Sequence, residues 1–254
     1  MESQISIALS GWSGVGCTKT TLLLAQLLHR QYVYIGAVFR ELGMRMGYDD
    51  EGHDRPNIDA YLEDHIGRVI DLYIEWKLTQ GKPLILESDI AAFRIGHHPN
   101  VFSIFLKADA PVRYERVRLD NRKGDVEVLK KRDAILRQKY IELWDIDIFD
   151  ETLITTKYNH VIDSSQMPIE QVVRACLQFM QQDARLLDQL DFDIAFAAIP
   201  SVTQRYESEG RSAFRDHLDS QYLLIPVDQI LDEIATTFPD HVAQFPDDIK
   251  KHLK

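Results

Sequence analysis

The chain has 254 residues, of which 45% are apolar and 27% charged, so it can form a sizeable core in one α/β domain with an appendage or in two small domains. Its 40 acidic residues outnumber its 29 basic ones, and the net charge of -11 argues against a protein that coats a nucleic-acid backbone. Only two cysteines occur, Cys17 and Cys176, which excludes a disulfide framework and fits a reducing compartment.

The beginning of the chain lacks the basic start and the long apolar stretch of a signal peptide. The sequence contains no run of about 18 apolar residues, so no membrane-spanning helix is predicted. We therefore expect a cytoplasmic protein that does not act in a membrane.

Short apolar segments alternate with helical patterns as far as residue 181. Apolar, β-branched runs predict strands at residues 5–10, 31–35, 84–86, 101–107 and 160–162. Helical spacing predicts helices at residues 18–30, 39–46, 57–79, 111–143 with a break at 121–125, and 168–181, and a polar loop at residues 48–57. Buried strands that alternate with helices predict a parallel sheet covered on both faces.

The character of the chain changes after residue 181, where it becomes acidic and is interrupted by prolines. We interpret residues 182–254 as a mostly helical C-terminal extension to a domain of residues 1–181. The extension has short apolar runs at residues 194–199 and 222–227. It either packs on the domain as a structural element or serves a protein partner or self-association.

The sequence GWSGVGCT, residues 11–18, lies between a predicted strand and a predicted helix, as a phosphate-binding P-loop does. Its glycines allow the backbone to curl, so that amides and the helix N-terminus together hold an anion. The fold class is therefore an α/β three-layer sandwich of the P-loop NTPase type. The predicted ATP-binding residues are Gly11, Ser13, Gly14, Val15, Gly16, Cys17 and Thr18.

Two oxygen-bearing side chains are candidates for holding Mg²⁺. Thr18 occupies the place where a P-loop hydroxyl ligates that ion. Glu87 ends a buried apolar strand, where a carboxylate can orient the metal or its waters. We predict that both belong to the nucleotide site.

Cys17 stands where the P-loop pattern expects a lysine. A neutral thiol supplies no cation for the β- and γ-phosphates. Lys19, two residues further on, is the nearest candidate, although a helix directs its side chain unfavourably. A helix N-terminus lowers the pKa of a thiol, but no His or Asn partner for Cys17 is evident, which disfavours nucleophilic catalysis.

Residues 5–28, followed by YIGAVFREL at 34–42, resemble the archaeal-type cytidylate kinases and their bacterial relatives, whose loop also lacks the usual lysine. Further similarities follow in order: ILESDI at 85–90, IFLKADAP at 104–111, RYER at 113–116, KRD at 131–133, Tyr140, and VIDSS at 161–165. The resemblance covers roughly residues 5–180. It implies a nucleoside monophosphate kinase that uses ATP and Mg²⁺ on small nucleotide substrates.

The resemblance also implies roles for individual residues. Gly36 and Arg40 lie in the segment that holds the acceptor monophosphate, which a guanidinium fork suits. The cations that resemble those of the lid, which closes over the transferring group, are Arg116, Arg122, Arg132 and Lys139.

Asp89 is a departure, because it stands where the family has an arginine that contacts the acceptor phosphate. An anion at this place repels a phosphate. Arg94, five residues on, is the predicted compensating cation. We assign Glu87, Asp89 and Arg94, with Gly36 and Arg40, to the substrate site.

The leading hypothesis is transfer of the γ-phosphoryl group of ATP to a nucleoside monophosphate, with CMP or dCMP as the first choice. Such an acceptor is already anionic, so no general base is required. One alternative is a nucleotide-binding regulatory protein with little turnover, suggested by Cys17, Asp89 and the acidic extension. Another is a kinase of a non-nucleotide hydroxyl, with Asp89 or Glu87 as the base.

Overall fold

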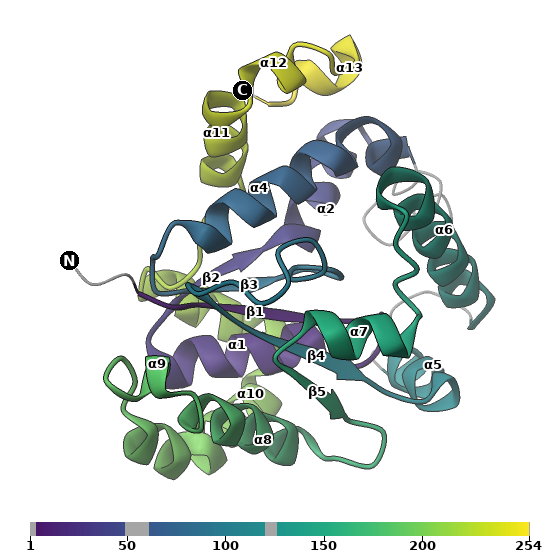
Figure 1. Ribbon diagram of the computed structural model, residues 1–254. Coiled ribbons are helices and arrows are strands. Elements are labelled where there is room, and N and C mark those ends of the chain that lie inside the picture. Colours follow the sequence, from purple (N-terminus) through teal and green to yellow (C-terminus); the bar gives the residue numbers. More distant parts are fainter. Residues whose placement is uncertain (1–3, 49–60, 120–125, 254) are drawn as a thin grey trace.

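The computed structural model describes residues 4–48, 61–119 and 126–253. Its strands form one parallel sheet in the order β2-β3-β1-β4-β5 (Figure 1). The strands are β1 (Ser6–Gly11), β2 (Gln31–Tyr34), β3 (Leu84–Glu87), β4 (Val101–Lys107) and β5 (His160–Asp163). Each predicted strand is confirmed to within one residue at either end, and the parallel sheet is confirmed with them.

The parallel register brings the carboxyl ends of the strands to one edge of the sheet. Leu9 and Tyr34 both pair with Glu87, and Gly11 pairs with Leu106. Side chains along β1 alternate between the two faces, and all six of its residues are buried. A central strand buried on both faces explains the continuous apolar run that precedes the phosphate loop.

Helices cover both faces of the sheet, which confirms the three-layer sandwich (Figure 1). One face packs on α1 (Cys17–Leu28), α8 (Ile169–Gln181), α9 (Ala184–Leu187) and α10 (Phe192–Ser220). The other packs on α2 (Ile35–Arg45), the π-helical turn η1 (Glu63–Gly67), α4 (Arg68–Thr79), α6 (Val126–Trp144), α7 (Glu151–Lys157) and α11 (Val227–Thr237). The remaining helices are α5 (Ala110–Leu119), α12 (Pro239–Val242) and α13 (Asp247–Lys250).

Two helices differ from the sequence prediction. Helix α2 begins at Ile35, directly after β2, and not at residue 39, because Ile35, Val38 and Leu42 form a continuous buried stripe. Helix α7 was not predicted, since its threonines and Ile154 have low helix propensity, but Asp150 caps it by accepting the amides of the second and third residues. The predicted break at 121–125, most of the predicted loop at 48–57 and the start of the helix predicted at 57 lie outside the described residues.

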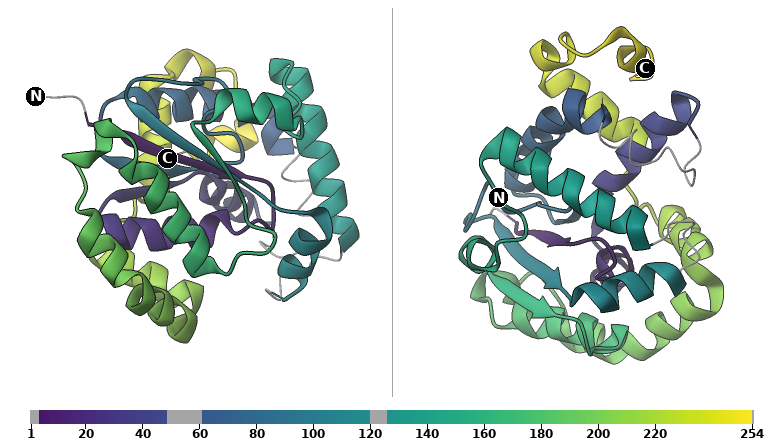
Figure 2. Two further views of the ribbon diagram at one scale, coloured as in Figure 1. Left: turned by 60° about the horizontal axis from the view of Figure 1, so that its bottom comes forward. Right: turned by 90° about the vertical axis from the view of Figure 1, so that its right-hand side faces the viewer.

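The C-terminal extension is helical, as predicted, and reaches both faces of the sheet (Figure 2). Helix α10 packs on α1 and α8, whereas α11 packs on α2 and α4. The chain crosses between the faces beside the outer strand β2, where the Tyr32 amide donates to Leu223 O at 2.6 Å and the Ile225 amide donates to Tyr32 O at 3.0 Å. The division into domains at residue 181 stays a prediction.

In the part of the chain that the structure describes, no helix combines the length and the apolar character needed to cross a bilayer.

Asp71 of α4 is a carboxyl group buried beneath α6. It is 5% exposed, and the Trp144 indole N–H donates to its Oδ2 at 2.6 Å. Burial raises the pKa of Asp71 to about 7, which the Trp144 hydrogen bond and Arg94 oppose. The folded chain therefore favours the neutral acid, and its stability falls as the pH rises from about 4, where an unfolded Asp titrates, to about 7.

Asp71→Asn keeps an acceptor for Trp144 and cannot ionise. We expect the free energy of unfolding of the variant, relative to the wild type, to increase by about 1.4 kcal/mol per pH unit between pH 4 and 7 and then to level off. Urea denaturation at a series of pH values measures this slope. Asp240→Asn on exposed α12 is the matched control, and a pH-independent difference for Asp71→Asn would contradict the assignment.

Candidate active site

The backbone between β1 and α1 curls as a phosphate loop requires. Gly14 and Gly16 have φ angles of 86° and 98°, in the left-handed region that favours glycine. At Gly14 a Cβ atom would lie 2.7 Å from the Arg113 carbonyl oxygen, so only glycine fits there. The Val15 amide donates to Trp12 O at 3.2 Å and closes the turn.

Two arginines of α5 bind carbonyl groups on one side of the loop. Arg113 Nη1 donates to Ser13 O at 2.9 Å, and Arg116 Nη1 donates to Val15 O at 3.3 Å. Because the C=O and N–H of a trans peptide point in opposite directions, the amides of Gly14 and Gly16 point away from α5. Together with the first amides of α1, which have no acceptor within the helix, they form a cradle for an anion.

Trp12 and Cys17 flank this cradle and are both fixed by packing. The Trp12 indole N–H donates to Ile148 O at 2.8 Å, and its ring stacks on Phe149 with centroids 5.1 Å apart. Burial raises the pKa of the Cys17 thiol well above its usual value, and the charges of Glu87 and Asp89 raise it further. A raised pKa disfavours the thiolate, which is the nucleophilic form of the side chain, and the role of Cys17 stays a prediction.

Thr18 and Glu87 meet at the base of the loop. Thr18 Oγ1 donates to Glu87 Oε1 at 2.6 Å, and the Tyr32 hydroxyl donates to the other carboxylate oxygen. Glu87 is only 6% exposed, and burial raises its pKa, while these two hydrogen bonds and the charges of Arg211 and Arg40 act in the opposite direction. A hydroxyl and a carboxylate at one point fit Mg²⁺, which is usually held by one or two protein oxygens, waters and substrate phosphates.

The predicted acceptor residues Gly36 and Arg40 lie against Tyr34, the last residue of β2. The guanidinium carbon of Arg40 is 4.5 Å from the centroid of the Tyr34 ring. That ring also covers Gly36, where a Cβ atom would lie 2.8 Å from Tyr34 Cε2. Since Tyr34 pairs with Glu87 across the sheet, the structure brings Gly36, Arg40 and Glu87 to the same edge.

Lys19 is engaged by the C-terminal extension. Its Nζ lies 3.4 Å from Glu207 Oε1 and 5.0 Å from the centroid of the Tyr206 ring, and both partners are on α10. Helix α1 presents this side chain to α10. Its catalytic role stays a prediction.

The predicted lid cations lie among carboxylates and carbonyl groups. Arg116 Nη2 donates to Ser164 O at 2.6 Å, and Arg132 Nη2 lies 4.0 Å from Asp89 Oδ2. Lys139 forms ion pairs with Asp64 and Glu142. Arg122 lies outside the described residues.

Arg94 was predicted to compensate for Asp89, but the structure gives it other partners. Its Nη2 lies 3.0 Å from Glu75 Oε2, and its guanidinium carbon is 3.5 Å from the Trp144 ring centroid. A cation that the structure places near Asp89 is Arg132, at 4.0 Å. A part for Arg94 in substrate binding stays a prediction.

Arg113, for which the sequence predicted no role, has a guanidinium buried between the loop and α6. Besides Ser13 O it contacts Asp133 Oδ2, at 2.7 Å from Nη2. The available signal was that Arg113 and Asp133 both lie in segments on which the resemblance rests. Tyr34 lies in such a segment too, whereas Arg211 and Arg215, which also approach the Tyr34 ring, lie in the extension, where no motif marked them.

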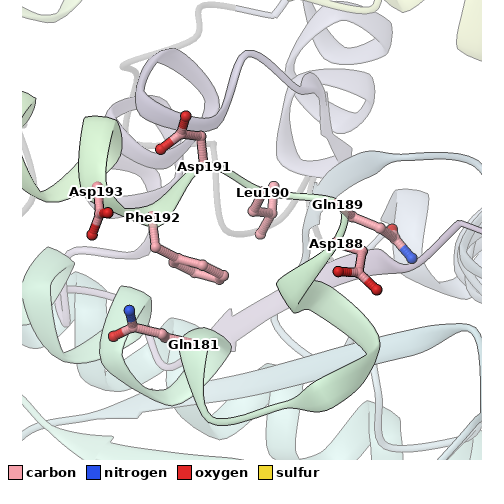
Figure 3. A pocket seen from close by; sticks show the side chains of 7 residues that line it. All are labelled: Gln181, Asp188, Gln189, Leu190, Asp191, Phe192 and Asp193. Carbon is pink, nitrogen blue, oxygen red and sulfur yellow. The ribbon is translucent and has the colours of Figure 1, made fainter.

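A pocket of about 510 Å³ lies at the opposite edge of the sheet, between the end of α8 and the start of α10 (Figure 3). Asp188, Asp191 and Asp193 line it, and another lining residue, Gln189, accepts the amide of Ile5 at the beginning of β1. Three carboxylates make this pocket unfavourable for a phosphate. The loop at the carboxyl edge therefore stays the candidate nucleotide site.

Comparisons with known proteins agree with this geometry. A family model described as an AAA domain matches residues 7–145. The cytidylate kinase of Pyrobaculum neutrophilum is 30% identical over 179 residues, which cover 69% of this chain and 92% of that protein. That of Methanocaldococcus jannaschii is 30% identical over 174 residues, covering 65% and 92%. Among solved structures, shikimate kinase from Acinetobacter baumannii is 16% identical, with a TM-score of 0.47, and covers 72% of this chain and 96% of that one.

The phosphate loop follows the central strand of a parallel sheet, and Thr18 donates a hydrogen bond to Glu87 at the base of the loop. Together with the family match, these features define a P-loop phosphotransferase of the nucleoside monophosphate kinase type. The chain belongs to the cytidylate kinase family. The family predicted from the phosphate loop and the segments that follow it is thereby confirmed.

Proposed function

We propose that this protein transfers the γ-phosphoryl group of Mg·ATP to CMP or dCMP. The observation that carries the proposal is the contact of Thr18 with Glu87 below the curled loop, with Arg40 beside the neighbouring strand end. The identity of the relatives as cytidylate kinases supports the choice of acceptor.

The donor half of the site consists of backbone amides. Those of Gly14, Gly16 and the first turn of α1 receive the phosphates of ATP. Thr18 and Glu87 are the residues that would hold Mg²⁺, which neutralises charge on the β- and γ-phosphates when bound. Both side chains are already fixed by their mutual hydrogen bond, so little reorganisation is needed.

The acceptor half favours a phosphate over a hydroxyl group. Glu87 accepts hydrogen bonds from Thr18 and Tyr32, so both its oxygens are occupied by donors and it is poorly placed to take a proton from a substrate. Asp89, the other candidate base, faces the cation Arg132. A phosphate acceptor needs no base, and Arg40 offers it a planar guanidinium.

A coupled assay with ATP, Mg²⁺ and a panel of CMP, dCMP, UMP, AMP and GMP tests the proposal. We expect kcat/KM for CMP or dCMP to exceed that for the purine nucleotides by at least about tenfold. EDTA is expected to abolish turnover. Tight ATP binding without turnover of any acceptor would instead identify a nucleotide-binding protein that has lost catalysis.

A further inference from the structure

Three guanidinium groups surround the ring of Tyr34 at the carboxyl end of β2. Their carbon atoms lie 4.5 Å (Arg40), 5.8 Å (Arg215) and 5.9 Å (Arg211) from the ring centroid. Arg40 belongs to α2, but the other two belong to α10. The C-terminal extension thus contributes two cations to the edge of the sheet that carries the phosphate loop.

The backbone of α10 is built to place them there. At Gly210, φ is 78° and ψ is 170°, a conformation essentially restricted to glycine, and the helix is interrupted. The segment that restarts at Arg211 is anchored by Phe214 and Leu218, which are fully buried in the cluster that includes α1. Arg211 and Arg215 are four residues apart and therefore share one face of this segment, toward Tyr34.

Arg211 and Arg215 bring positive charge to this edge without a carboxylate partner of their own among the described residues. Burial alone lowers the pKa of Arg211, yet its pKa is raised overall, because Tyr34, Glu87 and Tyr32 together outweigh burial. Glu87 is a buried anion at this edge, and its single carboxylate does not neutralise both Arg211 and Arg215.

We propose that Arg211 and Arg215 bind the phosphate group of the acceptor nucleotide together with Arg40, so that the C-terminal extension completes the acceptor site. This inference rests on the proposed function for the identity of the ligand. Guanidinium forks bind a terminal phosphate through paired N–H donors, and several half-buried forks on one phosphate offset the cost of gathering like charges. Asp89, two residues after the end of β3, would repel a phosphate, and additional cations would offset that repulsion.

The test uses Arg211→Met and Arg215→Met in the full chain. Steady-state kinetics give KM for CMP and for ATP, and isothermal titration gives the Kd of CMP without ATP. We expect each substitution to raise KM and Kd for CMP by at least about tenfold and to leave KM for ATP within about twofold, since a hydrogen bond to a charged group is lost on the acceptor side only. Arg211→Lys is expected to recover part of the loss.

Arg174→Met is the matched control. The Arg174 guanidinium also lies over a ring, 5.8 Å from the centroid of Phe196, but Arg174 is on the solvent-exposed side of α8. This change is expected to leave both affinities unaltered.

These experiments distinguish phosphate binding by Arg211 and Arg215 from the proposed kinase activity. Unchanged CMP affinity in Arg211→Met and Arg215→Met would overturn the inference and make these residues structural partners of Tyr34. A wild-type protein that binds CMP and loses affinity in the variants, but turns over no acceptor, would sink the proposed function and leave the inference standing. A wild-type protein that binds none of the monophosphates in the panel would overturn both.

Discussion

Thr18→Ala is expected to lower kcat/KM for Mg·ATP by about 100-fold or more, the effect typical of removing a fixed polar group from a site of transition-state charge. The Thr18 hydroxyl is one of two donors to Glu87, a buried carboxylate whose pKa burial already raises. Its loss removes the proposed metal ligand and leaves the carboxylate less well oriented. Initial rates measured against ATP and Mg²⁺ at saturating CMP report both effects.

Two further substitutions make this result specific. Thr18→Ser retains the hydroxyl and is expected to stay within a few fold of the wild type, roughly 1 kcal/mol in transition-state free energy. Thr21→Ala removes a hydroxyl that donates to Cys17 O inside α1 and does not contact Glu87, so activity should persist. If Thr18→Ala kept wild-type kcat/KM, or if Thr21→Ala were equally damaging, Thr18 would have no special part in the chemistry.

The sheet and the loop were predictable because local sequence determines them. A strand buried on both faces must be a continuous apolar run, and residues 5–10, 84–86 and 101–107 all show one. The loop is equally local, because left-handed backbone at Gly14 and Gly16 demands glycine. The meeting of Thr18 with Glu87 follows from these two features once the strands are parallel neighbours.

The partners of the charged side chains could not be predicted in the same way. Arg94 was predicted to compensate for Asp89 because the two are close in sequence. In the folded chain, helix packing places Arg132 near Asp89, and Arg94 forms an ion pair with Glu75. Spacing along a chain fixes which face of a helix a residue occupies and says nothing about which distant helix packs on that face.

The contacts of the C-terminal extension were even less predictable from the sequence. Its acidic composition gave no reason to expect Arg211 beside Tyr34, because the contact depends on the docking of α10 against α1. The same docking engages Lys19 with Glu207. Composition reports an average over the whole segment, whereas a site depends on the few side chains that a fold turns inward.

Arg113→Met is expected to destabilise the protein by about 3–5 kcal/mol, because it removes one partner of a buried ion pair. The side chains of Arg113 and Asp133 are 4% and 13% exposed, and their charged atoms are 2.7 Å apart. Arg118→Met on the same helix is the matched control, since it breaks an ion pair with Glu115 in which both side chains are more than half exposed, and it should cost only a small part of that amount. Urea denaturation measures both.

A double variant, Arg113→Met with Asp133→Leu, separates the stability of the ion pair from its effect on the loop. Replacing both buried charges by apolar side chains is often close to neutral, so the free energy of unfolding should largely recover. Affinity for ATP should not recover, because Arg113 also holds Ser13 O and thereby directs the Gly14 amide away from α5. If ATP affinity returned with stability, the cradle would form without Arg113; if Arg113→Met cost no more than Arg118→Met, the pair would not stabilise the fold.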